Sequence, residues 1–260
     1  MVSHNTPMTA SPLTDVLLCL SATAAGAVNA VAGGGTLLTF PPLETVMGAA
    51  AANATSTVAL LPGSVAGAAG YREELKAGRE LVRLLLVPSL VGGFFGAGLV
   101  VWQPQAFATL VPWLILTAVV LFALQQPLSR YLRKHRPDHA PGPVGRAGLV
   151  AFQFVVAVYG GYFGAGIGIL MLTSLGLMGV ADIHRANGIK TFLAANINAA
   201  SVLVFVWSGL VHWPVALMMA VAAVVGGYAG ARLARRLKPA VVRGVVMAIG
   251  VGLAAYYFAK

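Results

Sequence analysis

A single shift of 134 residues aligns one half of the chain with the other. The segment 91–99, VGGFFGAGL, returns at 225–233 as VGGYAGARL. The same shift, with no gap, also pairs Gly26 with Gly160, Gly34 with Gly168, Leu38-Thr39 with Leu172-Thr173, Ala52-Asn53 with Ala186-Asn187 and Thr57 with Thr191. We therefore interpret the chain as two copies of one unit. In an apolar chain, duplication with glycine-broken segments is typical of secondary transporters.

The composition predicts a membrane protein. Hydrophobic residues make up 58% of the 260 residues and charged residues only 9%, and the mean hydropathy is +0.84, whereas soluble domains carry about 25% charge. Runs apolar enough to form spanning helices cover residues 13–32, 45–70, 84–101, 106–125, 147–164, 192–210, 214–233 and 241–258. We expect an all-α integral membrane protein with one polytopic domain, residues 1–260, made of repeat 1 (about 13–126), a basic cytoplasmic linker (127–146) and repeat 2 (about 147–259).

Several other classes of protein are not expected. The net charge of +10 does not indicate nucleic-acid binding, because the basic residues lie in short loops rather than on one polar face. The single cysteine, Cys19, cannot form an intrachain disulfide. We find no P-loop, no cluster of His and Cys, and no Ser-His-Asp set in register, so no cofactor, metal or catalytic residue is predicted. The acidic residues, with Asp15, Glu44 and Asp182 among them, lie at segment ends or in loops, which leaves no carboxylate at mid-membrane to relay protons or bind sodium.

The basic residues constrain the topology. Four precede the run 84–101, five lie in the linker, two precede the run 192–210, and five lie between the last two runs or at the ends of those runs that face each other. Eight simple crossings would place basic loops on both sides, against the positive-inside rule. If the first segment of each copy instead enters and returns as a glycine-broken helical hairpin, each copy makes three full crossings and the second copy is inverted. This topology places 16 of the 17 basic residues in the cytoplasm and both termini outside. A bent helix that spans fully over 13–32 is the open alternative.

Two glycine clusters predict where the hairpins turn. The first, Gly33-Gly34-Gly35, precedes a short helix over 36–40 that Pro41 and Pro42 end, and the second, at 160–168, precedes a helix over 169–177. A helix start exposes unpaired N–H groups and about half a positive charge, so two such starts near mid-membrane predict one anion site. The other glycines, at 92, 93 and 96 and at 226, 227 and 230, are interpreted as close contacts between helices.

Polar side chains inside the apolar runs complete the candidate site. The spacing of Asn187, Lys190, Thr191 and Asn198 places them on one helix face. Lys190 either pairs with an anion or extends to the cytoplasmic surface, and for any single Ser or Thr, hydrogen bonding between helices is the alternative. The candidate substrate-binding residues are Gly33, Gly34, Gly35, Thr36, Asn53, Ser56, Thr57, Gly166, Gly168, Asn187, Lys190, Thr191 and Asn198.

The glycine-rich segments carry a resemblance to a known family. The segment NAVAGGGTLLTFPP at 29–42, the segment ANATST at 52–57 and the segment GGYFGAGIGILM at 160–171 resemble the repeat signatures of the TauE/SafE sulfite exporter family, as do Lys190, the pair Asn196 and Asn198, and SGLVHW at 208–213. The resemblance covers nearly the whole chain. It implies transport of sulfur-containing or organic anions, such as sulfite, sulfoacetate or related sulfonates, across the bacterial inner membrane.

We expect a secondary transporter that exports a small anion of this kind. The inside-negative membrane potential favours anion exit by about 2.3 kcal/mol per charge per 100 mV, so a uniporter needs no coupling carboxylate. The expected partners are a small anionic substrate, the lipid bilayer and a second copy of the chain in a homodimer. The alternative is an integral-membrane enzyme or assembly factor that holds a lipid or sulfur intermediate.

Overall fold

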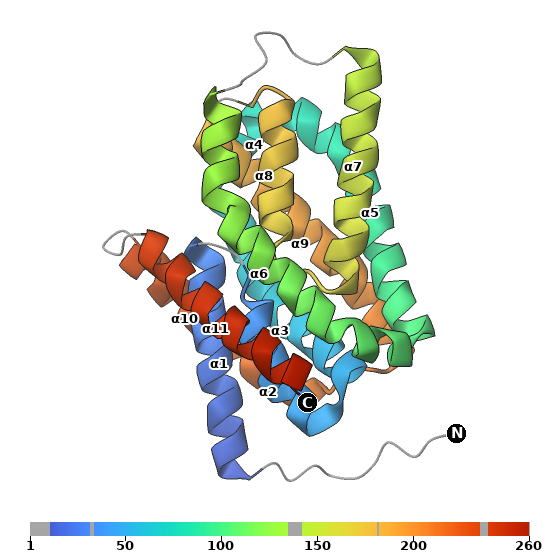
Figure 1. Cartoon of the computed structure of the whole chain (residues 1–260), viewed down its shortest axis with the longest axis vertical. Coiled ribbons are helices and arrows are strands. Elements are labelled where there is room, and N and C mark those ends of the chain that lie inside the picture. The colour runs from blue at the N-terminus through green and yellow to red at the C-terminus, as the bar shows by residue number, and fades with distance from the viewer. Residues whose placement is uncertain (1–10, 32–33, 135–141, 181, 235–238, 260) are drawn as a thin grey trace.

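A computed structural model describes residues 11–31, 34–134, 142–180, 182–234 and 239–259 (Figure 1). Within these ranges the chain is helical and forms no β-strand. In chain order the helices are α1 (Pro12–Val31), α2 (Thr36–Met47), α3 (Ala49–Ala69), α4 (Arg72–Ala77), α5 (Arg79–Trp102), α6 (Pro104–Lys134), α7 (Pro143–Tyr162), α8 (Ile167–Leu177), α9 (Ile183–Ser208), α10 (Trp213–Ala234) and α11 (Pro239–Ala259).

Five helices are long and apolar enough to cross a bilayer. The qualifying segments are Pro12–Asn29 of α1, Arg79–Trp102, Pro104–Leu124 of α6, Pro143–Tyr162 and Ile183–Ser208. Shorter apolar stretches occur at Ile167–Leu177, Trp213–Ala229 and Met247–Ala259. Large apolar side chains on the outside of these helices are exposed, as at Val91 and Phe95 of α5 and Leu217 of α10. Such an outer surface suits contact with lipid rather than water.

The eight apolar runs each coincide with a helix, but three boundaries were predicted wrongly. Helix α2 does not end at Pro41; it continues through Pro41 and Pro42 to Met47. A proline removes one N–H and breaks a helix in water, but in a buried helix the neighbours can compensate for the lost bond. Two fully buried side chains, Phe40 and Leu43, hold this part of α2 in the core.

The other two boundaries concern α9 and the linker. Helix α9 begins at Ile183 rather than near residue 192, because the carboxylate of Asp182 accepts hydrogen bonds from the N–H groups of His184 (3.0 Å) and Arg185 (3.3 Å) as an N-cap. Lys190 therefore lies inside a candidate span instead of before it. The linker is shorter than predicted at 127–146, since α6 continues to Lys134 and α7 begins at Pro143, a favourable first residue for a helix.

The two halves of the chain pack against each other reciprocally. Helix α1 packs along α10, and α7, which occupies the same place in the second half, packs along α5; α3 contacts α9, and α6 contacts α11. Glycines allow the first two contacts: a Cβ atom added at Gly92 would lie 2.6 Å from Cβ of Ala157, and one added at Gly226 would lie 2.7 Å from Cα of Thr23. The two contacts correspond under the shift, because Gly226 lies 134 positions after Gly92 and Ala157 lies 134 positions after Thr23. The prediction that these glycines serve close helix contacts is confirmed at 92, 93, 96 and 226.

Each half begins with a hairpin of two helices. In Figure 1, α7 runs down from the top of the molecule and α8 turns back upward, whereas α1 rises from the bottom and α2 runs back down. The chain between α7 and α8 turns at Gly164 and Gly166, which have φ angles of +83° and +84°. Only glycine adopts such angles without strain. The turn is narrower than the predicted cluster 160–168, because Gly160 and Gly161 still belong to α7 and Gly168 to α8.

Candidate functional site

The two hairpin turns lie against the same part of α6. Gly34, with φ +90°, is so close to Phe122 that an added Cβ atom would lie 2.7 Å from Cε2 of that ring. A Cβ atom added at Gly166 would lie 3.2 Å from Cδ1 of Leu121, the neighbouring residue of Phe122. Segments about 130 positions apart in sequence are therefore brought together by one turn of α6. This junction is the candidate functional site.

Helix α3 contributes buried polar groups to the junction. The Asn53 side chain is 1% exposed, and its Nδ2 donates a hydrogen bond to the carbonyl oxygen of Tyr162 at the end of α7 (3.0 Å). Its Oδ1 atom is buried and has no hydrogen-bond partner among the described residues. The Ser56 hydroxyl is bonded to that of Thr39 in α2 (2.6 Å), and Thr57 donates to the carbonyl oxygen of Asn53 in its own helix (2.8 Å). Asn53 and Ser56 thus face the turns, whereas the Thr57 hydroxyl is hydrogen-bonded to the backbone of its own helix, α3.

The start of α2 is already capped by a side chain. The Gly35 N–H donates to Oδ1 of Asn29 at the end of α1 (2.7 Å), and the N–H groups of Leu37 and Leu38 bond to the carbonyl oxygens of Gly34 and Gly35. The side-chain oxygen of Asn29 therefore accepts the hydrogen bond of an N–H group to which an anion was expected to bind. Thr36 is half-buried at this helix start, and Gly33 lies outside the described residues.

The start of α8 differs, because its first N–H groups have no acceptor. Gly166, in the left-handed conformation, precedes the helix and no side chain caps it. Its carbonyl oxygen accepts a bond from Ile169 (3.1 Å), but in the described chain the N–H groups of Ile167 and Gly168 have no partner. The Tyr159 hydroxyl donates to the carbonyl oxygen of Ala165 (2.9 Å) and fixes the turn from α7. Unpaired N–H groups at a fixed helix start can bind an anion.

Lys190 lies beside this uncapped helix start. A Cβ atom added at Gly168 would lie 3.1 Å from Cδ of Lys190 and 3.7 Å from its Cε. No carboxylate in the described ranges forms an ion pair with this ammonium group. Its neighbour Thr191 lies against Gly67 of α3, at 3.5 Å from an added Cβ. The aliphatic part of the Lys190 side chain therefore lies against the helix start at which, in the described chain, the N–H groups of Ile167 and Gly168 have no partner.

Asn187 and Asn198, the remaining predicted residues of α9, share this helix face, but within the described ranges neither forms a hydrogen bond with the turns. Asn187 and Asn198 are half-buried, and in this part of the structure neither has a hydrogen-bond partner. The structure brings together Gly34, Gly35, Asn53, Ser56 and Gly166 around α6 and the first turn, and Gly168 with Lys190 at the second. It does not connect Asn198 to either group.

Aromatic rings fill the space beside the two turns. Phe40 packs edge-on against Phe163 with ring centroids 5.5 Å apart, and Phe107 packs edge-on against Tyr162 at 5.1 Å. Phe40, Phe107 and Phe163 are at most 2% exposed. This aromatic cluster packs α2 and the end of α7 against the beginning of α6.

Several of these groups were missed from the sequence. Asn29 lies in the segment 29–42, but its role as a cap was not predicted, although it precedes Gly35 by only six positions. Tyr159 and the aromatic cluster gave no signal, because aromatic residues in apolar runs occur for many reasons. The buried pair Gln153 and Ser89, joined by a 2.9 Å hydrogen bond between α7 and α5, was also missed; a glutamine within an apolar run could have indicated it.

Two broken hairpins, apolar spanning helices and an uncapped polar junction between the halves define a multi-pass helical membrane protein of the transporter class. Comparison with known families gives the particular assignment. The family model described as "Sulfite exporter TauE/SafE" matches residues 18–257. The chain belongs to this family, and it is a membrane transporter rather than an enzyme.

Curated relatives are named as probable membrane transporters. "Probable membrane transporter protein YfcA" of Escherichia coli (strain K12) is 28% identical, with 91% of this chain and 85% of the relative aligned. "Probable membrane transporter protein" of Haemophilus influenzae is 26% identical, with 89% of each chain aligned. "Probable membrane transporter protein ORF9" of Sinorhizobium sp is 24% identical, with 91% of this chain and 89% of the relative aligned. No solved structure matches the chain.

Proposed function

We propose that the chain exports a small sulfur-containing or organic anion, such as sulfite, sulfoacetate or a related sulfonate, and that the anion binds at the start of α8. The observation that carries the proposal is the position of Lys190 against Gly168, beside N–H groups that have no acceptor in the described ranges. An ammonium group and a helix start both stabilise negative charge. The family description names sulfite exporters, which supports this class of substrate.

The site we propose is asymmetric. Asn29 already satisfies the Gly35 N–H at the first helix start, so the anion is held mainly by the second. Asn53, whose Oδ1 has no partner in the part of the chain that the structure describes, is within the same junction through its bond to Tyr162. An oxygen acceptor repels an anion but receives a hydrogen bond from a protonated oxyanion or an amine. We infer that Asn53 selects ligands that carry a donor, such as hydrogen sulfite.

We further propose that the two copies are inverted in the bacterial inner membrane. The reciprocal packing of α1 with α10 and of α7 with α5 supports this arrangement, as do the opposite directions of α1 and α7 in Figure 1. Trp102 and Trp207, which are 75% and 78% exposed, would lie at the outer interface, where indole rings are enriched. Export would then follow the membrane potential.

A homodimer remains a proposal and would need a surface other than the glycine faces. Gly92, Gly93 and Gly96 pack against α7 or α9, and Gly226 packs against α1. These small-residue faces are therefore used within the chain. The outer surfaces of α5 and α10, which expose Val91, Phe95 and Leu217, are candidates.

A binding experiment tests the proposed site. The purified chain is titrated calorimetrically with sulfite, sulfate, thiosulfate, taurine and sulfoacetate, and the best ligand is then measured with Lys190→Gln. A charge-assisted contact contributes about 1.5–3 kcal/mol, so Lys190→Gln is expected to weaken binding by about tenfold or more. Lys76→Gln, which removes an exposed lysine of α4, is the matched control and should bind like the wild type. Equal affinity of Lys190→Gln and wild type would overturn the site.

A further inference from the structure

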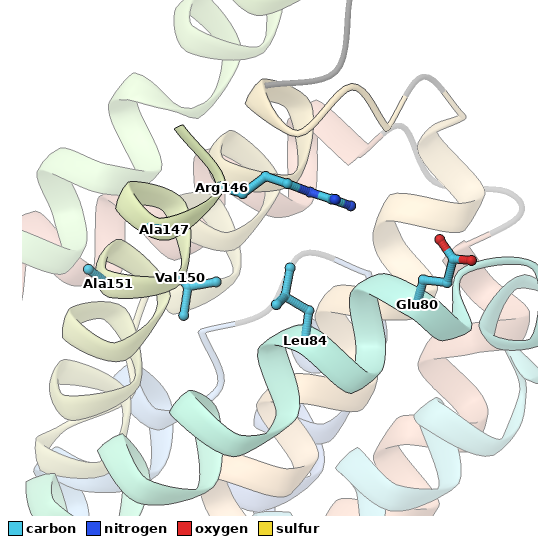
Figure 2. Close-up of a pocket in the computed structure, with 6 residues that line it drawn as sticks. All are labelled: Glu80, Leu84, Arg146, Ala147, Val150 and Ala151. Carbon is cyan, nitrogen blue, oxygen red and sulfur yellow. The ribbon is translucent and has the colours of Figure 1, made fainter. Parts of the chain in front are cut away.

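A groove lies between the first turns of α5 and α7, away from the junction. Its cavity of about 490 Å³ is lined by Glu80 and Leu84 from α5 and by Arg146, Ala147, Val150 and Ala151 from α7. In Figure 2, Leu84 and Val150 face the groove, and the Arg146 side chain extends across its mouth toward the side that carries Glu80. The groove thus has apolar walls and one charge of each sign at its rim.

The groove lies where lipid headgroups are expected. Helices α5 and α7 are both candidate spans, and both begin at this end of the molecule. The lining residues Glu80, Leu84, Arg146 and Ala151 are exposed. An apolar groove that opens outward at the end of two spans meets the boundary between acyl chains and headgroups. A water-soluble ligand would leave the walls formed by Leu84 and Val150 in contact with water.

The two charges indicate which headgroup fits. Within the described ranges Arg146 and Glu80 do not form an ion pair with each other, so both remain available. A guanidinium group binds a phosphate through two N–H donors, and a carboxylate accepts hydrogen bonds from a primary ammonium group. A purely anionic headgroup would satisfy Arg146 but would be repelled by Glu80. A zwitterionic headgroup with a phosphate and a primary amine matches both.

We propose that this groove binds phosphatidylethanolamine, with its phosphate on Arg146, its ammonium group on Glu80, and its acyl chains along Leu84, Val150 and Ala151. The proposal depends only on the helices spanning a bilayer and is independent of the anion that is transported. It assigns to the α5–α7 contact a structural lipid at the end of the molecule where α5 and α7 begin.

Native mass spectrometry of the full chain tests the proposal. Delipidated protein in detergent is mixed with dioleoyl phosphatidylethanolamine, phosphatidylglycerol or phosphatidylcholine, and the bound fraction is measured. The wild type is expected to retain phosphatidylethanolamine in preference to the other two. Because the charges are exposed, each contact should change binding only by about threefold. Arg146→Gln should weaken both phosphatidylethanolamine and phosphatidylglycerol, whereas Glu80→Gln should weaken phosphatidylethanolamine alone.

Matched variants separate the groove from general surface charge. Arg79→Gln and Glu73→Gln remove exposed charges of the same end that do not line the cavity, and both should bind phosphatidylethanolamine like the wild type. The proposal is overturned if the three lipids bind equally to the wild type, if phosphatidylglycerol is preferred and Glu80→Gln leaves binding unchanged, or if Arg79→Gln loses as much lipid as Arg146→Gln. A melting temperature equal to that of the wild type confirms that each variant is folded.

Discussion

Lys190 occupies the position in the second copy that Ser56 occupies in the first. Ser56 is bonded to Thr39 and closes a polar pair between α2 and α3, whereas Lys190 lies along Gly168 at a helix start without a cap. The same position in the repeat therefore holds a neutral, hydrogen-bonded serine in the first half and a positively charged lysine in the second half. Under the proposed function, the duplicated unit therefore provides one anion site, in its second copy, rather than two.

Gly168→Ala tests whether the lysine is positioned by the absence of a side chain. The new Cβ would lie 3.1 Å from Cδ of Lys190, and a flexible lysine can move away from it, so the fold should tolerate the change. We expect an unchanged melting temperature and an anion affinity reduced by about threefold to tenfold, since the ammonium group is displaced from the helix start. Binding equal to wild type, measured by calorimetry, would show that Lys190 does not act from this place.

Gly34→Ala is the contrasting substitution. Gly34 has φ +90°, and its Cβ would meet the buried ring of Phe122, which cannot move without disturbing the core. The strain is expected to destabilise the protein by roughly 1–3 kcal/mol. A lower melting temperature in detergent checks this. If Gly34→Ala melts with the wild type, the tight turn before α2 is not required.

Asn29→Ala tests the cap of α2. Loss of the bond between Oδ1 and the Gly35 N–H should cost about 1 kcal/mol of stability, and Asn29→Asp, which keeps an acceptor at the positive end of the helix, should retain most of it. Thermal unfolding of both variants gives the comparison. Equal destabilisation by Ala and Asp would contradict the capping role.

At the scale of helices, the glycine contacts determine how the two halves are held together. Gly92 and Gly161 allow α5 and α7 to approach until backbone meets backbone, and Gly26 and Gly226 do the same for α1 and α10. One contact joins α7, the first helix of the second copy, to α5 of the first copy. The other joins α1, the first helix of the first copy, to α10 of the second copy. Because each contact holds one hairpin in place, we expect the proposed site at α6 to depend on both.

Gly92→Ala should therefore destabilise the protein, while Gly98→Ala should not. Both glycines lie in α5, but a Cβ added at Gly92 would lie 2.6 Å from Cβ of Ala157, whereas one added at Gly98 would meet nothing within 4 Å. Overpacking of this kind costs about 1–3 kcal/mol. Urea or thermal unfolding in detergent compares the two variants. Equal stability would contradict the close approach of α5 and α7.

The sequence predicted the helices better than their ends. Long apolar runs identify membrane helices, because a helix satisfies the hydrogen bonds of its own backbone N–H and C=O groups in lipid. Each predicted run accordingly corresponds to a helix. The continuation of α2 through Pro41 and the start of α9 at Asp182 were not predicted, since the first depends on burial and the second on a cap hidden in a polar loop. Similarly, the glycines and Lys190 were selected from the sequence, but the contact of Gly34 and Gly166 with α6 depends on tertiary packing.

For the whole molecule, the inverted arrangement makes a prediction that eight simple crossings do not. Single cysteines at Gln103 and Trp213, placed in a Cys19→Ser background, should both react with a membrane-impermeant maleimide from outside the cell. Cysteines at Val144 and His184 should react only after the membrane is opened. All four positions are exposed. With eight simple crossings, Gln103 and Trp213 would lie on opposite sides, so labelling of only one of them from outside would contradict the inverted repeat.

Flux of an anion through the purified chain tests the central claim most directly. Liposomes that contain only this protein are loaded with labelled sulfite or sulfoacetate, and efflux is followed while a potassium gradient with valinomycin sets an inside-negative potential. We expect efflux to be faster than from empty liposomes, to increase with the potential, since about 2.3 kcal/mol per charge acts at 100 mV, and to fall strongly with Lys190→Gln. Efflux equal to that of empty liposomes for every anion tested, or efflux through Lys190→Gln at the wild-type rate, would contradict the account.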